Sequence, residues 1–260
     1  MDENTERELR RRLAKAEFPR ASAYDPRWIM ANAMGPHVLW LAESLSQVFE
    51  FKPGMRVLDL GCGRAVSSIF LAREFGVTVW AADYWIKPSE NWKRIQDFNL
   101  GDRVFPIYTE AHAMPFADDF FDAIVSFDAY HYFGTDDLYL PHCTRLLRSG
   151  GRLGIVVPGV TREFTEIPDH LRPYWMWDFR SFHSSDWWRN HWQKTTLIEV
   201  EIADSLNNGW RLWLEWEEIR AQAGPPTKGL LPRTSADEAA MLRADGGRIL
   251  SFTRVVGRRP

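Results

Sequence analysis

The spacing of apolar residues predicts helices at the start of the chain and a sheet after them. Up to about residue 50, apolar side chains recur at helical spacing, most clearly at Val38, Leu41, Leu45 and Val48. Beyond Pro53 and Gly54, short apolar runs alternate with amphipathic segments. The runs MRVLDL, VTVWAADY, RVFPIY, FDAIVSF and GGRLGIVVPG are the predicted strands.

Helices are predicted between these strands. The segment AVSSIFLAREF ends at Gly76, a residue suited to follow a helix. The segment ENWKRIQDFNL is expected to begin at a Ser89 cap, and a further helix is expected from Asp136 or Asp137 through Leu147. Apolar strands that alternate with helices indicate a parallel sheet covered on both faces.

The last hundred residues follow a different order. A long irregular stretch precedes the helix SSDWWRNHWQKT and the strand LIEVEIADS; two more helices, GWRLWLEWEEIRAQ and SADEAAMLRAD, lead to the strand RILSFTRVVG. The predicted fold is therefore α/β, with a Rossmann-like, seven-stranded, mostly parallel sheet, helices on both faces and a C-terminal antiparallel strand. We expect a helical cover at 1–50, a ligand-binding core at 51–160, and a lid segment with the remaining strands of the same domain at 161–260.

Composition narrows the possible functions. The net charge of −3 over 260 residues argues against a nucleic-acid partner, which would require a basic surface. The two cysteines, Cys62 and Cys143, fit neither a disulfide framework nor a metal site, and free thiols suit a reducing compartment. No apolar run has the length of a signal peptide or a membrane span. We expect a cytoplasmic protein with no metal and no stable membrane insertion; the sequence does not indicate its oligomeric state.

The sequence Val57-Leu58-Asp59-Leu60-Gly61-Cys62-Gly63 stands at a predicted strand-to-helix turn. Glycine lets a ligand approach the main chain, and a nucleotide-like ligand of this fold lies at the carboxyl ends of the strands. A carboxylate at Asp59 would repel a pyrophosphate but suits a ligand with a cationic amino group. The turn therefore predicts a site for a positively charged nucleoside.

This motif resembles the first motif of class I S-adenosylmethionine-dependent methyltransferases, an acid followed by three spaced glycines. Asp59, Gly61 and Gly63 match, whereas Ala65 replaces the third glycine. The resemblance extends over about 100 residues, through FFDAIVS at the fourth strand and LLRSGG before the fifth. It implies that S-adenosyl-L-methionine is the cofactor and that the enzyme is of the small-molecule methyltransferase type.

Further matches in that family imply specific cofactor contacts. The acid Asp83 at the end of the second strand would take the ribose hydroxyls, because a carboxylate offers two acceptor oxygens. Tyr84 would pack on the adenine. The stretch from Glu110 to Phe116 resembles the adenine loop, in which Glu110 would accept from the adenine amino group and the Ala111 amide would reach a ring nitrogen. Phe127, at the end of the fourth strand, is expected to contact the cofactor.

Methyl transfer from a sulfonium requires alignment and exclusion of water, and a base only where the acceptor must lose a proton. His131 is the candidate base because an imidazole titrates near neutral pH, with Tyr130 and Tyr132 beside it to orient the acceptor. Structural packing is the alternative for all three. This segment also resembles the cyclopropane fatty acid synthase branch, but Tyr130 replaces the glutamate of that branch, so we do not expect cyclopropanation.

Tryptophan is concentrated between Trp175 and Trp216. On the helix after Ser184, Trp188 and Trp192 share one face and Trp187 does not. Most of these rings have packing as their simplest role. The irregular Trp175–Trp177 segment is instead predicted to form an aromatic lid over a flat, apolar or cationic acceptor. The candidate acceptor contacts are Tyr24, Trp28, Trp175 and Trp177.

Two other functions compete with methyl transfer to a small-molecule or lipid-like acceptor. A non-catalytic protein that binds the cofactor as a scaffold or regulator would keep the same glycines. An NAD(P)-dependent oxidoreductase also has a glycine turn after its first strand, but Asp59 and Ala65 disfavour it.

Overall fold

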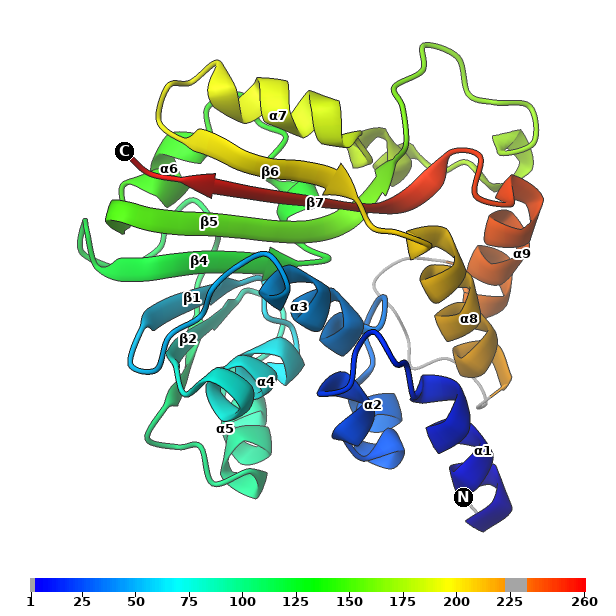
Figure 1. Ribbon diagram of the computed structural model, residues 1–260, viewed down its shortest axis with the longest axis horizontal. Coiled ribbons are helices and arrows are strands. Elements are labelled where there is room, and N and C mark those ends of the chain that lie inside the picture. Colours follow the sequence, from blue (N-terminus) through cyan, green and yellow to red (C-terminus); the bar gives the residue numbers. More distant parts are fainter. Residues whose placement is uncertain (1–2, 223–232) are drawn as a thin grey trace.

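The strands form a single sheet in the order β3-β2-β1-β4-β5-β7-β6 (Figure 1). The computed structural model describes residues 3–222 and 233–260. The strands are β1 (Arg56–Leu60), β2 (Thr78–Asp83), β3 (Val104–Tyr108), β4 (Phe121–Phe127), β5 (Leu147–Val160), β6 (Glu199–Ser205) and β7 (Leu250–Arg258). The first five are parallel, and β7 runs antiparallel to both β5 and β6. This confirms the predicted seven-stranded, mostly parallel sheet with an antiparallel C-terminal strand.

Helices surround the sheet. They are α1 (Glu3–Leu13), α2 (Pro26–Asn32), α3 (Val38–Ser46), α4 (Val66–Phe75), α5 (Pro88–Asp97), α6 (Leu140–Thr144), α7 (Ser185–Gln193), α8 (Gly209–Gln222) and α9 (Ser235–Asp245). Short 3₁₀ turns occur at Ala21–Ala23, Tyr130–Tyr132, Arg172–Tyr174 and Trp177–Ser181. In Figure 1, α7 lies along β6 at one edge, whereas α8 and α9 stand together beyond one end of the strands.

Alternate residues of each central strand enter two separate cores, as expected when side chains point to opposite faces. Val57 of β1 and Val125 of β4 belong to the core beneath α3, α4 and α8. Leu58 and Ile124 belong to the core beneath α6 and α7, which also contains Trp188. Each face of the sheet is therefore covered by helices, as the continuous apolar strands predicted.

Two predicted helix boundaries are wrong. Helix α5 begins at Pro88 after an N-cap at Lys87 with no side-chain cap bond, because proline is favoured in the first helical turn. The helix predicted from Asp136 or Asp137 through Leu147 is only α6. Asp136 instead accepts the Leu138 amide at 2.9 Å in a turn, and Leu147 already belongs to β5.

The ends of β1, β2 and β4 meet at one edge of the sheet. The register pairs Leu60 with Ala82 across β1 and β2, and Asp59 with Val125 across β1 and β4. The segments that follow these strands carry most of the predicted site. Among the described residues, no helix combines the length and apolar character needed to span a bilayer.

The proposed boundaries at 1–50, 51–160 and 161–260 remain a prediction. Residues 1–2 and 223–232 within them lie outside the described residues.

Candidate active site

The turn after β1 exposes bare backbone at the edge of the sheet. Gly61 and Gly63 have φ values of 75° and 53°, in the left-handed region that favours glycine. A Cβ on Gly61 would lie 2.4 Å from the Ala129 Cβ. Ala65 has φ 57° and caps the start of α4, so the family's third glycine is replaced by a residue that keeps a left-handed conformation.

Asp83 joins this turn to the end of β2. Its Oδ2 accepts the Gly63 amide at 2.8 Å, and its Oδ1 accepts the amides of Trp85 and Ile86 at 2.7 and 2.9 Å. The side chain is only 8% exposed but lines a cavity. A carboxylate held by backbone amides in this way is fixed in position and retains acceptor capacity for a ligand's hydroxyl groups.

Asp59 lies beneath the turn. It is fully buried and is not among the residues that line the cavity. Its Oδ2 accepts the hydroxyls of Ser67 and Ser68, both at 2.6 Å, whereas Oδ1 has no hydrogen-bond partner. Burial raises the pKa of Asp59 to about 6. In this structure Asp59 ties β1 to the start of α4; direct contact with the cofactor remains a prediction from the resemblance.

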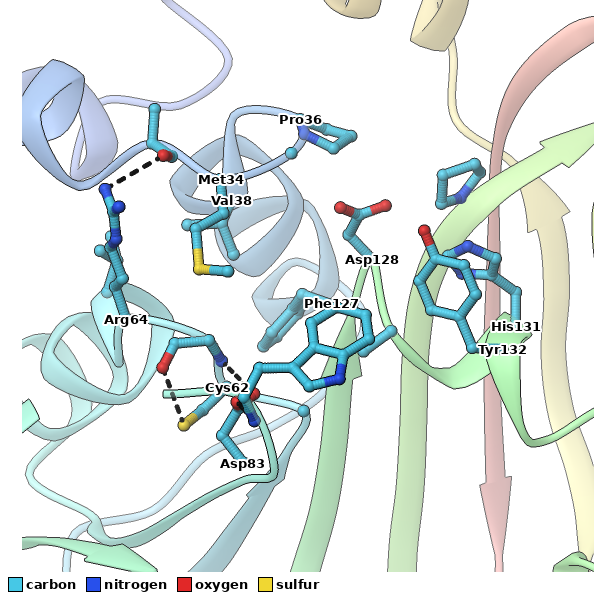
Figure 2. Close-up of a pocket in the computed structure, with 18 of the residues that line it drawn as sticks. Met34, Pro36, Val38, Cys62, Arg64, Asp83, Phe127, Asp128, His131 and Tyr132 are labelled. Atoms are coloured by element: carbon cyan, nitrogen blue, oxygen red, sulfur yellow. Dashed lines mark hydrogen bonds between the residues drawn. The ribbon is translucent and has the colours of Figure 1, made fainter. Parts of the chain in front are cut away.

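A cavity of about 580 Å³ begins at this turn and reaches α3 and α8 (Figure 2). This is an ordinary volume for a small-molecule site. Most of the predicted cofactor contacts line it: Gly61, Gly63, Asp83, Tyr84, Glu110, Ala111 and Phe127. The structure thus brings together residues that span almost seventy positions of the sequence.

The predicted adenine contacts lie at the outer side of the cavity. Tyr84 is 55% exposed and stacks on Tyr108, with 5.5 Å between ring centroids and 22° between planes. Both carboxylate oxygens of Glu110 bond to His112, one to its amide at 2.8 Å and the other to Nδ1 at 2.9 Å. The exposed rings leave a flat aromatic surface against which a base can stack.

The three candidates after β4 separate in the structure. His131 and Tyr132 line the cavity, and Figure 2 shows their rings side by side. Burial lowers the pKa of His131 to about 3, with Arg233 adding to the effect, so the imidazole is neutral at neutral pH. Tyr130 is fully buried among Phe133, Tyr139, Trp188 and Trp192 and is absent from the cavity wall. We therefore assign Tyr130 a packing role, and the expected role in orienting the acceptor is withdrawn.

The predicted acceptor contacts do not reach this cavity. Tyr24 is buried and bonds Glu74, and Trp28 packs on Phe98. Trp175 packs against Phe164 and Phe179 beside a second, smaller cavity, and Trp177 is 76% exposed. Local sequence could not reveal this, because the packing of Trp175 depends on tertiary contacts in a segment of short 3₁₀ turns.

Other residues close the far end of the cavity, and sequence reasoning missed them. Their side chains come from the start of α3, the segment after β4, and α8 and α9 with the residues just before α9. The main ones are His37, Asp128, Phe182, Trp213, Trp216, Arg220, Arg233 and Glu238. Asp128 was the most accessible to prediction, since it stands directly after Phe127. The remainder depend on contacts between distant segments.

Comparison with known proteins places this site in context. Residues 57–151 match a family model described as a methyltransferase domain. Methyltransferase GfsG of Streptomyces halstedii is 34% identical over 116 residues, which cover 44% of this chain and 42% of that protein. The ubiquinone/menaquinone biosynthesis C-methyltransferase UbiE of Paraburkholderia xenovorans (strain LB400) is 27% identical over 177 residues, 66% of this chain and 68% of its own length.

A solved structure shares the fold over most of its length. Geranyl diphosphate C-methyltransferase from Streptomyces coelicolor A3(2), in complex with Mg²⁺, geranyl diphosphate and S-adenosyl-L-homocysteine, superposes with a TM-score of 0.65. The two are 18% identical, and the match covers 84% of this chain and 78% of that one. The stretch matched by the family model contains the glycine turn, Asp83, Glu110 and Asp128.

Proposed function

We propose that the chain is a class I S-adenosylmethionine-dependent methyltransferase and that it methylates a small-molecule acceptor bound at the α3–α8 end of its cavity. The cofactor of this family is S-adenosyl-L-methionine. The alternative of an NAD(P)-dependent oxidoreductase, which the sequence disfavours, gains no support, because the family model that matches residues 57–151 is a methyltransferase domain.

The residues at the glycine turn fit this cofactor. Gly61 and Gly63 leave the main chain open to a ligand, and Asp83 presents a nearly buried carboxylate to the same cavity. We propose that these residues, with Tyr84, Glu110, Ala111 and Phe127, hold the nucleoside, and that Asp59 positions the turn from below. When bound, the cofactor supplies an activated methyl group on a sulfonium.

The observation that carries the proposal is the continuity of the cavity. The same space is lined by the glycine turn at one end and by Trp213, Trp216 and Arg233 at the other. The chain can therefore hold a second molecule next to the cofactor and shield both from water, which methyl transfer requires. Phe182 and the two tryptophans supply the aromatic surface that was expected from the Trp175–Trp177 segment.

His131 and Tyr132 line the same cavity, and Figure 2 shows both rings beside Asp128. The neutral imidazole of His131 has a buried Nδ1 with no partner, which is free to hydrogen-bond an acceptor. With a pKa of about 3, it is a weak base and better suited to orienting the acceptor than to storing its proton. We do not propose cyclopropanation, because Tyr130 replaces the glutamate of the cyclopropane fatty acid synthase branch.

A labelling experiment tests the proposal. The purified protein is incubated with methyl-labelled S-adenosylmethionine and a cell extract, which is then separated into small molecules, protein and nucleic acid. We expect the label to move into a small molecule that separates chromatographically from S-adenosylmethionine, and we expect no such product when the protein is left out. Label in the protein and nucleic-acid fractions should stay at the level of that control. Label in protein or nucleic acid would contradict the proposed acceptor class. Tight binding of the cofactor with no transfer to any fraction would favour the scaffold or regulator function.

A further inference from the structure

Asp128 presents an unpaired carboxylate at the junction of the two ends of the cavity. It directly follows β4, has φ 53°, and its amide donates to the Val156 carbonyl at 3.0 Å, which fixes the backbone. Figure 2 shows its carboxylate between Phe127 and the pair His131 and Tyr132. Within residues 3–222 and 233–260, this carboxylate has neither a hydrogen bond nor an ion pair.

Gly35 makes the space that the carboxylate occupies. A Cβ at position 35 would lie 1.9 Å from Asp128 Oδ2. The Gly35 carbonyl accepts hydrogen bonds from Trp216 Nε1 at 2.8 Å and from Arg220 at 3.4 Å, so α8 holds this backbone in place. The position of the Asp128 carboxylate is therefore determined by three separate segments of the chain.

The cations near Asp128 are already paired with other carboxylates. Arg233 bonds Asp178 at 3.0 Å and Glu238 at 2.7 Å, and Arg220 bonds Glu217 at 3.2 Å. Among the described residues, neither arginine makes an ion pair with Asp128. Burial, followed by the charge of Glu238, raises the pKa of Asp128 well above its usual range. A bound cation would offset both effects, whereas a bound anion would add to them.

Two buried imidazoles on the same wall also lack partners. His37 Nδ1 accepts the Trp40 amide at 3.3 Å, which leaves its buried Nε2 unpaired, and the buried Nδ1 of His131 is unpaired as well. Their side chains are 3% and 1% exposed. Buried polar groups are rarely left without partners, so these atoms independently indicate a polar ligand. Trp213, Trp216 and Phe182 add aromatic rings, which attract cations.

We propose that Asp128 determines acceptor specificity and that the acceptor is an amine, which binds with its protonated nitrogen on the Asp128 carboxylate. For transfer to this nitrogen, the ammonium first gives one proton to the Asp128 carboxylate. The freed lone pair then forms the N–C bond as the methyl–sulfur bond breaks, and S-adenosylhomocysteine leaves. This inference rests on the proposed function, because it places the amine beside the cofactor. It goes beyond that function by naming the chemical class of the acceptor and the residue that selects it.

Three matched probes test the charge preference. Benzylammonium, benzyl alcohol and benzoate are titrated calorimetrically at pH 7 into the protein saturated with S-adenosylhomocysteine. We expect benzylammonium to bind at least tenfold more tightly than benzyl alcohol, and benzoate to bind most weakly. The Asp128→Asn variant should bind benzylammonium at least tenfold more weakly than the wild type, and its affinity for benzyl alcohol should change less than twofold. Asparagine has the same size and tolerates the same positive φ.

Two further variants separate the role of the carboxylate from general damage. Gly35→Ala should reproduce the loss of benzylammonium binding by displacing the carboxylate, and should add nothing in an Asp128→Asn background. Asp137→Asn, an equivalent change at a side chain that is 93% exposed, should leave all three affinities unchanged. Melting temperatures check that each variant is folded. If Asp128→Asn does not fold, Gly35→Ala alone tests the role of the carboxylate.

The outcomes distinguish this inference from the proposed function. If S-adenosylhomocysteine does not bind, the proposed function and the inference both fail. If S-adenosylhomocysteine binds, two results would overturn the inference alone. One is that benzyl alcohol or benzoate binds as tightly as benzylammonium. The other is that Asp128→Asn binds benzylammonium as tightly as the wild type does.

Discussion

The Gly63 amide donates a hydrogen bond of 2.8 Å to the Asp83 carboxylate, across the ends of β1 and β2. One oxygen of this carboxylate therefore sets the position of the glycine turn, while the other accepts two amides at the start of the next segment. The turn and the proposed ribose contact are parts of one arrangement, and a change in either should affect the other.

Replacement of Asp83 should weaken cofactor binding. Asp83→Ala removes the proposed acceptor of the ribose hydroxyls and strands buried amides, so we expect a loss of roughly 1–3 kcal/mol in binding free energy. Calorimetry with S-adenosylhomocysteine measures it. Asp83→Asn should show a similar loss, because its NH₂ group donates hydrogen bonds and cannot replace a carboxylate oxygen that accepts them. An unchanged dissociation constant in the folded variants would remove Asp83 from the site.

Substitution of Gly61 should destabilise the protein more than substitution of a glycine with free space around it. Gly61 and Gly150 have φ values of 75° and 73°, but a Cβ on Gly61 would lie 2.4 Å from Ala129, whereas nothing lies within 4 Å of one on Gly150. Backbone strain costs on the order of 1–3 kcal/mol at either position. In urea unfolding, Gly61→Ala should therefore lose clearly more stability than Gly150→Ala. Equal losses would mean that the close approach to Ala129 is unimportant.

Asp59 should make stability depend on pH. Its folded-state pKa of about 6 exceeds the ordinary value of 3.8, so its contribution is fully present below about pH 3.8 and is lost as pH rises through 6. Wild type should lose about 2–3 kcal/mol of unfolding free energy relative to Asp59→Asn between pH 4 and pH 7. Urea unfolding at both pH values checks this. Parallel pH profiles for the two proteins would show that the carboxylate does not titrate in this range.

His131 should influence turnover without setting its pH dependence. Its pKa of about 3 keeps the imidazole neutral from pH 5 to pH 8. With the acceptor identified by labelling, we expect His131→Asn to lower kcat/KM about tenfold, the scale of one hydrogen bond to the acceptor, and to leave the shape of the pH profile unchanged. If the wild-type kcat/KM instead falls below about pH 6.5 and the variant shows no such fall, His131 would be identified as a titrating base.

The sequence was most informative where local spacing determines structure. The strands followed from apolar runs, and the faces of α7 followed from helical periodicity: Trp188 and Trp192 are both fully buried, while Trp187 stacks on His183. The cofactor end of the site was predictable for a related reason. Its residues stand at the ends of successive strands, which a parallel sheet brings to one edge.

The acceptor end depends on contacts between distant segments. The packing of Asp128 against Gly35 and the pairing of Arg233 with Asp178 join positions that no periodicity connects. The lid prediction failed for the same reason: Trp175 and Trp177 stand in a segment whose direction is set by packing on Phe164 and Phe179, whereas the rings that line the cavity come from α8 and from Phe182.

The central claim is that the glycine turn and Asp83 bind an S-adenosyl nucleoside. Calorimetric titration of S-adenosylhomocysteine into the purified protein tests this most directly. The account predicts saturable heat with one molecule bound per chain. Absence of any heat of binding, from folded protein at millimolar nucleoside, would contradict it.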